Sequence, residues 1–253
     1  MSGHSKWSSI KHKKAVTDAK RGKVFSKISR EITVAARLGG GDVNMNPTLR
    51  TVLMNAKEAN MPQDNMIKAI KKGTGELPGV NYEEFTYEGY GPGGVAVMIE
   101  TLTDNKNRTT AEIRSIFTKK NGNLAGSGAV AWMFDKKAYF SVKAGKEEEE
   151  KLMESVLDAG VDDIVFDDET LLFEITAPPG NFDAVRTVIE TAGYEIESSS
   201  LAYVPKNAVK VTGGEARSVI GLIETLEDHD DVQHVYANFD IPGNEIEEYA
   251  SDK

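Results

Sequence analysis

Basic side chains with phosphate-binding chemistry dominate the start of this 253-residue chain. Nine Lys or Arg residues fall between Ser2 and Arg30, against a single acid, Asp18. Such cations bind nucleic-acid backbones by displacing condensed counterions, and the ring of Trp7 could stack on an unpaired base. The pattern therefore predicts contact with a polyanion. The nine cations are Lys6, Lys11, Lys13, Lys14, Lys20, Arg21, Lys23, Lys27 and Arg30.

The basic segment contains no motif that reads a base sequence. It lacks zinc-finger spacing, basic-zipper heptads and an aromatic RNA-recognition strand, so we expect contacts that follow charge and shape. Residues 1–14 have no sustained apolar period and are interpreted as a flexible basic arm. Two other interpretations stay open: an organellar transit peptide, which favours Arg where this arm has mostly Lys, and a solubilising tail.

Charge is divided unevenly along the chain, whose formal net charge is −10. Residues 1–72 hold 15 of the 30 cations and 5 of the 40 acids, which gives +10. The remaining residues hold 15 cations and 35 acids, which gives −20. A polyanion would be attracted to the first part and repelled by the second.

Catalytic and metal-binding patterns are weak. There is no cysteine, which excludes a disulfide, a thiolate zinc site and a Cys nucleophile and is compatible with a reducing compartment. His4 and His12 lie in the arm, while His229 and His234 are five residues apart and do not share a helical face. A solvated acidic turn is a simpler interpretation of "DHDDVQH" than a metal site. We predict no catalytic residue, no cofactor and no metal.

A glycine-rich stretch, "YEGYGPGGVAV" (87–97), could be mistaken for a phosphate loop. It lacks the Lys-Ser/Thr that should follow and leads into a strand, so a nucleotide P-loop is not indicated. A tight turn between strands accounts for the glycines, because glycine adopts positive φ without strain. Close approach of the backbone to a ligand at Gly93 and Gly94 remains the alternative.

The stretch "TDNKNRTT" (103–110) joins a strand to a helix. The helix start, with Lys106 and Arg108 beside it, could bind a phosphate or a carboxylate. Equally, Asp104, Asn105 and Asn107 could simply turn and cap the chain. The two loops together suggest an alternative function, a phosphate-ligand-binding enzyme.

Three amphipathic helices are expected after the arm. Apolar residues recur at helical spacing up to the glycines at 39–41. Asn46 and Pro47 suit the cap and first turn of a second helix, and Pro62 begins a third that ends at Gly73. This is the pattern of a small helical domain.

Beyond a Gly/Pro linker at 73–81, strands alternate with helices. Residues 138–204 read as βαββαβ, the ferredoxin-like order, and the flanking segments form a second such unit when this block is removed. One helix is expected to begin with a capping box, Thr109 and Glu112. The expected strands cover 95–102, 129–134, 138–142, 161–166, 171–176, 195–204, 208–211 and 232–239.

The predicted fold class is α+β, with an N-terminal helical domain followed by two ferredoxin-like α/β domains, one inserted in the other. The helical domain with its arm covers 1–75. The discontinuous ferredoxin-like domain covers 82–135 plus 206–240, and the inserted acidic domain covers 136–205.

Four stretches together closely resemble the YebC/PmpR family, which includes mitochondrial translational activators of cytochrome c oxidase subunit I. They are "GHSKWSSIKHKK", "NMPQDNMIKAIKKGTG", "YEGYGPGGVAV" and "LTDNKNRTTAEIRSIFTKKNGNLAGSGAVAWMF". The resemblance implies a three-domain protein without catalytic triad or cofactor. It also implies DNA-binding transcriptional regulation, and ribosome-associated help with translation through consecutive prolines.

Carried over by position, the resemblance implies three nucleic-acid contact regions. The family motif starts at Gly3 with no presequence before it, which favours a bacterial cytoplasmic member. The implied contacts are Lys6, Trp7, Lys11, Lys13 and Lys14 in the arm, Lys20, Arg21, Lys23, Lys27 and Arg30 in the first helix, and Asn105, Lys106 and Arg108 in the loop.

The sequence thus favours a non-enzymatic regulatory factor that binds DNA or ribosomal RNA, with structured RNA preferred. The ribosome is a further expected partner, and a protein-docking role for the acidic region stays open. We expect no small-molecule substrate, and no membrane, because no apolar run reaches the roughly 18–20 residues that a span needs.

Overall fold

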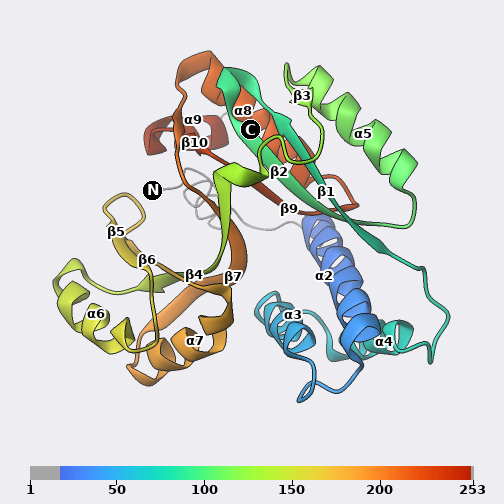
Figure 1. The fold of residues 1–253 in the computed structure, drawn as a ribbon, viewed down its shortest axis with the longest axis horizontal. Helices are drawn as coiled ribbons and strands as arrows, with labels where there is room; N and C mark the ends of the chain where they lie inside the picture. The colour runs from blue at the N-terminus through green and yellow to red at the C-terminus, as the bar shows by residue number, and fades with distance from the viewer. Residues whose placement is uncertain (1–17, 252–253) are drawn as a thin grey trace.

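The structure, a computed structural model, describes the backbone of residues 18–251 and the side chains of residues 21–251. The arm residues Lys6, Trp7, Lys11, Lys13 and Lys14 lie outside the described residues, as does the side chain of Lys20. In Figure 1 the described chain forms a helical unit and two sheet-containing units. The predicted fold class is confirmed.

Three helices form the first unit: α2 (Asp18–Gly39), α3 (Pro47–Glu58) and α4 (Gln63–Gly73). The predicted cap is present, because Asn46 Oδ1 accepts a hydrogen bond from the Leu49 N–H at 3.0 Å. Its amide group also donates to the carbonyls of Ala35 and Gly40, at 2.9 and 2.8 Å, and so attaches the start of α3 to the end of α2. Apolar residues such as Ile32 are fully buried between the helices.

A four-stranded sheet of order β3-β1-β2-β9 forms the second unit. Apolar residues of β2 and β9 on one face pack against both α5 and α8, in a core that includes Ile99, Phe117 and Leu222. The elements are β1 (Glu83–Tyr90), β2 (Ala96–Thr103), α5 (Lys106–Lys119), β3 (Asn123–Leu124), α8 (Gly213–Glu227) and β9 (Val232–Ala237).

The third unit is a second four-stranded antiparallel sheet, of order β5-β6-β4-β7. Its chain order is βαββαβ, as predicted for a ferredoxin-like unit. In the sequence this unit lies between β3 and β9 of the other sheet. Because this order suits an inserted domain, we propose the domain boundaries predicted from the sequence: 1–75, 82–135 plus 206–240, and 136–205. The elements are β4 (Phe134–Lys143), α6 (Glu149–Leu157), β5 (Asp163–Asp167), β6 (Leu172–Ala177), α7 (Phe182–Thr191) and β7 (Glu195–Pro205).

The predicted strand at 129–134 is wrong. Residues Ala131–Met133 form a 3₁₀ turn, η2, and β4 begins only at Phe134. The reason is the buried carboxylate of Glu88, which accepts the N–H groups of Gly128, Val130 and Ala131 at 2.6–2.8 Å. Burial alone would raise the pKa of Glu88, but these three backbone donors outweigh it and lower the pKa. The segment folds around an anion instead of pairing as a strand.

Short elements complete the fold. The strand expected at 208–211 is β8 (Val209–Lys210), which pairs in parallel with β10 (Phe239–Asp240) outside the main sheet. Strands β1 and β3 of the second unit and the terminal helix α9 (Gly243–Ser251) were not predicted. The remaining 3₁₀ turns are η1 (Pro92–Gly94), η3 (Lys146–Glu148) and η4 (Pro179–Asn181).

The units contact one another through side chains. Tyr203 of β7 and Tyr236 of β9 pack edge to face, with ring centroids 5.3 Å apart. Arg186 of α7 binds Glu58 at the end of α3 at 3.1 Å. None of the described helices combines the length and apolar character that a membrane span requires.

Candidate nucleic-acid interface

The basic face of α2 lies against the turn between α8 and β9, residues 227–231, which we call the acidic turn. Lys27 Nζ donates to the Glu227 carbonyl at 2.6 Å, and Lys23 Nζ donates to the Asp228 carbonyl at 3.2 Å. One turn further along α2, Arg30 donates to the Asp230 carbonyl and, at 3.1 Å, to a carboxylate oxygen of Asp231. These three predicted site cations therefore already have acceptors within the chain.

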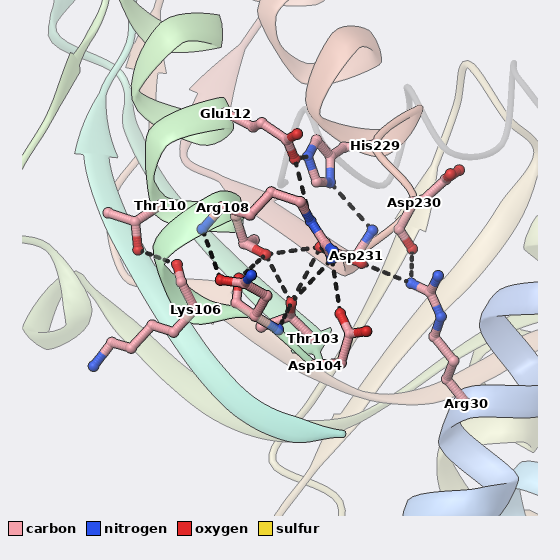
Figure 2. A network of polar contacts seen from close by, with 12 residues as sticks. Arg30, Thr103, Asp104, Lys106, Arg108, Thr110, Glu112, His229, Asp230 and Asp231 are labelled. Carbon is pink, nitrogen blue, oxygen red and sulfur yellow. Dashed lines mark hydrogen bonds and ion pairs between the residues drawn. The ribbon is translucent and has the colours of Figure 1, made fainter. Parts of the chain in front are cut away.

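Asp231 is the centre of this contact (Figure 2). Its side chain is only 6% exposed. One carboxylate oxygen, Oδ2, accepts from Arg108 and from the Thr109 hydroxyl at 2.7 Å each, and from the Thr103 hydroxyl at 3.2 Å. The other faces Arg30, so the carboxylate joins α2 to the start of α5.

Asp231 and Arg108 shift each other's pKa. Burial alone would raise the pKa of Asp231, but hydrogen bonds from Arg108 and Thr109 and the charges of Arg108 and Arg30 hold it below its usual value. The same contact, with a second hydrogen bond that Arg108 donates to Asp104, raises the pKa of Arg108. Both groups are therefore charged across the physiological range.

The start of α5 differs from the prediction. The helix begins at Lys106, and its cap is Asn105, whose Oδ1 accepts the Arg108 N–H at 3.1 Å. The predicted capping box is wrong, because Thr109 lies inside the helix and its hydroxyl bonds Asp231. Both interpretations of this stretch hold in part, because Asn105 caps the helix and the Asp231 carboxylate of the protein itself binds Arg108 and Thr109.

The three loop residues predicted to bind nucleic acid are held in different ways. Asn105 caps α5, and Arg108 binds Asp231 and, at 2.9 Å, Asp104. Lys106 points away from this network (Figure 2), and its ammonium lies 4.5 Å from the ring centre of Phe85. Only Arg108 of the three joins the contact with α2.

A metal site does not fit this cluster. Single ligand atoms of Glu112, His229 and Asp231 lie within 4.8 Å of one another. However, His229 Nδ1 accepts the Asp231 N–H at 3.1 Å, so Nε2 carries the proton and donates to Glu112 at 2.9 Å. Asp231 in turn holds the Arg108 cation. Both ring nitrogens and the carboxylate are already used, and Arg108 would repel a second cation.

The acidic turn is also not simply solvated, as the sequence suggested. Asp231 is buried because two arginines bind it. His234, beyond the turn, places Nε2 3.4 Å from Glu31 of α2. Asp231 was not predicted as a site residue, because in "EDHDD" it cannot be told apart from its acidic neighbours.

The two loops considered for a phosphate site lie at opposite ends of β2. The eight residues of β2 lie between the turn η1 and the start of α5, and they span about 26 Å along the strand. Gly93 has φ 69°, and a Cβ there would lie 2.7 Å from Val211 Cγ1. The glycine loop is thus a packed turn, and the two loops do not form one site.

Comparisons with known proteins identify relatives over nearly the whole chain. Residues 5–76 match the family described as the TACO1/YebC N-terminal domain, and residues 82–239 match its second and third domains. A protein of Desulfatibacillum aliphaticivorans, named "Probable transcriptional regulatory protein", is 57% identical, and the alignment covers 98% of this chain and 100% of the relative. One of the same name from Dictyoglomus turgidum is 54% identical over 96% and 97%.

A solved structure has the same fold. The crystal structure of a conserved hypothetical protein from Aquifex aeolicus superposes with a TM-score of 0.79 at 46% sequence identity. The match covers 89% of this chain and 92% of that one.

Proposed function

This chain belongs to the TACO1/YebC family, and from that premise we propose that it is a non-enzymatic, cytoplasmic regulatory factor that binds nucleic acid. Its relatives carry the name "Probable transcriptional regulatory protein", which supports a regulatory role. The observation that carries the proposal is the division of charge, +10 over residues 1–72 and −20 over the rest. Counterion release makes the first part a binding surface for phosphates, while the second repels them.

Asn105 caps α5 and Lys106 lies over the ring of Phe85, and the other predicted contact residues fall into two groups. We propose that the cations of the arm and of the start of α2 bind phosphates directly, namely Lys6, Lys11, Lys13, Lys14, Lys20 and Arg21, and that Trp7 stacks on an unpaired base. Lys23, Lys27, Arg30 and Arg108 already hold acceptors of the chain itself. These four contribute to binding only after the contact between α2 and the acidic turn opens.

RNA is the partner that we favour over promoter DNA, with translation on the ribosome as the setting. A recognition helix must present its side chains to the major groove of a duplex. The basic face of α2 instead lies on the acidic turn. An aromatic residue in a basic arm suits unpaired bases of a structured RNA. These features favour a role in translation, where the family resemblance implies help through consecutive prolines, over the recognition of promoter DNA.

The test is the salt dependence of RNA binding by the full chain. Replacing Lys6, Lys11, Lys13, Lys14 and Lys20 by Gln should lower the slope of log affinity against log salt by about 3.5 for a single-stranded RNA. A control with the same charge change replaces Lys119, Lys120, Lys136, Lys151 and Lys210. Equal slopes for wild type and the first variant would contradict the proposal.

The alternative of a phosphate-ligand-binding enzyme has a simple test of its own. A ligand that binds only the folded state raises the unfolding midpoint. Because the two candidate loops lie at opposite ends of β2, we expect no nucleotide in a panel to raise the midpoint. A selective shift by one nucleotide would revive the alternative.

A further inference from the structure

A groove of about 650 Å³ runs between α2 and α4 and is closed on one side by the linker before β1. We call it the α2–α4 groove. Arg30 and Ser29 line it from α2, Asn65, Lys68 and Lys72 from α4, and Tyr82 from the linker. It contains three cations and no carboxylate among its lining residues. Of the predicted site residues whose side chains the structure describes, only Arg30 lines it.

Lys68 and Lys72 are the two cations of the groove that have no partner among the described residues. They are four residues apart on α4 and therefore share a face of the helix. Both are exposed, and neither has an ion pair or hydrogen bond with any residue that the structure describes. Arg30, in contrast, binds Asp231. An anion in the groove would meet two ammonium groups without displacing a partner.

The walls of the groove are fixed before any ligand arrives. The Thr33 hydroxyl of α2 donates to the Ala69 carbonyl of α4 at 3.2 Å. A Cβ at Gly73 would lie 2.4 Å from the Thr33 carbonyl oxygen, so only glycine permits this approach of the two helices. Arg37 donates to Asn81 and to the Tyr82 carbonyl and holds the linker in place. Such a preformed site loses little conformational entropy on binding.

We propose that the α2–α4 groove binds the phosphodiester backbone of the nucleic acid, with Lys68 and Lys72 each on a phosphate. Ser29 and Asn65 supply polar groups for the sugar and the phosphate oxygens. The lining contains no motif that reads base edges, so this contact positions the strand without selecting its sequence. The inference rests on the proposed function and adds a second contact surface, on a different helix from the arm.

The test compares two double variants of the full chain with equal charge change. Lys68→Gln/Lys72→Gln removes the groove cations, and Lys57→Gln/Lys71→Gln removes two exposed cations of the same unit outside the groove. The probes are a mixed-sequence single-stranded RNA and a DNA duplex. For the groove variant we expect the salt slope to fall by about 1.4 on the RNA or about 1.8 on the duplex, which is roughly 25- to 60-fold in affinity at about 0.1 M salt. The probe whose affinity falls more shows whether the groove binds single-stranded RNA or duplex DNA.

The control variant should change the affinity for either probe much less than the groove variant does. Lys68→Arg/Lys72→Arg should restore binding, since the charge is kept. If the groove and control variants lost equal affinity, or if the arginine variant did not restore binding, the proposal that the groove binds phosphates would be wrong. Unchanged thermal midpoints in all variants would exclude unfolding as the cause.

The outcomes separate the two proposals. If wild type shows no salt-dependent binding to either probe, the proposed function fails. If wild type binds and the arm variant weakens it while the groove variant behaves like the control, only the groove is wrong.

Discussion

Two basic helices of the same unit use their cations differently. Lys23, Lys27 and Arg30 of α2 all donate to the acidic turn, whereas Lys68 and Lys72 of α4 have no partner among the described residues. Both helices carry several Lys or Arg residues, yet the sequence predicted nucleic-acid contacts only for those of α2. The difference shows that a run of cations identifies a binding surface only where the fold does not already supply the acceptors. On α2 the cations join two units, and on α4 they remain available to a ligand.

The sharpest way to break this comparison is Asp231→Asn. Loss of the buried charge weakens its bonds with Arg108 and Arg30, so we expect the free energy of unfolding to fall by about 2–3 kcal/mol. RNA affinity should rise at the same time, because both arginines lose a competing anion. Urea unfolding and an RNA titration measure the two effects.

Asp230→Asn is the matched control, since it removes one exposed carboxylate and leaves the carbonyl that Arg30 uses. It should change stability by less than about 0.5 kcal/mol. If both variants lost RNA affinity, the acidic turn would be part of the binding surface and not its competitor.

A second variant acts on the other side of the comparison, where α4 approaches α2 most closely beside the α2–α4 groove. Gly73→Ala places a methyl group 2.4 Å from the Thr33 carbonyl oxygen and 2.7 Å from Ala36 Cβ. The helices must separate, which should cost about 1–3 kcal/mol of stability. Thermal unfolding of the full chain measures the loss.

The control for Gly73 is Gly22→Ala, also within a helix, where the added methyl has no described atom within 4 Å outside its chain neighbours and the backbone of its own helix. It should stabilise the protein by up to about 1 kcal/mol. Equal effects of the two substitutions would mean that the helices do not depend on close approach at Gly73.

The pH dependence of the unfolding free energy tests the same contact between Asp231 and its arginines, with a smaller expected effect. The pKa of Asp231 is lower in the folded protein than in the unfolded chain. Its contribution is therefore fully present above the unfolded value of about 4 and is lost as pH falls through the folded value. The difference in unfolding free energy between wild type and Asp231→Asn should shrink below about pH 4. A constant difference down to pH 2 would show that the charge of Asp231 contributes nothing.

Local signals in the sequence predicted much of this molecule, because their causes lie within a few residues. Asn46 and Pro47 start α3 where expected, and apolar spacing located α2 and α4. The turn at Gly93 has the positive φ that the glycine suggested. Each of these depends on the backbone conformation of one turn.

The errors share a different cause, a contact between residues far apart in the sequence. The segment expected as a strand at 129–134 folds around Glu88, about forty positions earlier. Arg108 was expected to meet an external anion but binds Asp231, more than a hundred positions away. Neither partner could be picked out among forty acids. The candidate site was therefore recognised by its charge, while the partners of its cations were not.

The most direct test of the central claim compares the two helices in one experiment. Salt titrations of RNA binding are measured for Lys23→Gln/Lys27→Gln and for Lys68→Gln/Lys72→Gln in the full chain. The account predicts that the α4 pair lowers the slope of log affinity against log salt by about 1.4, while the α2 pair leaves it nearly unchanged. A larger loss of slope in the α2 pair would contradict it.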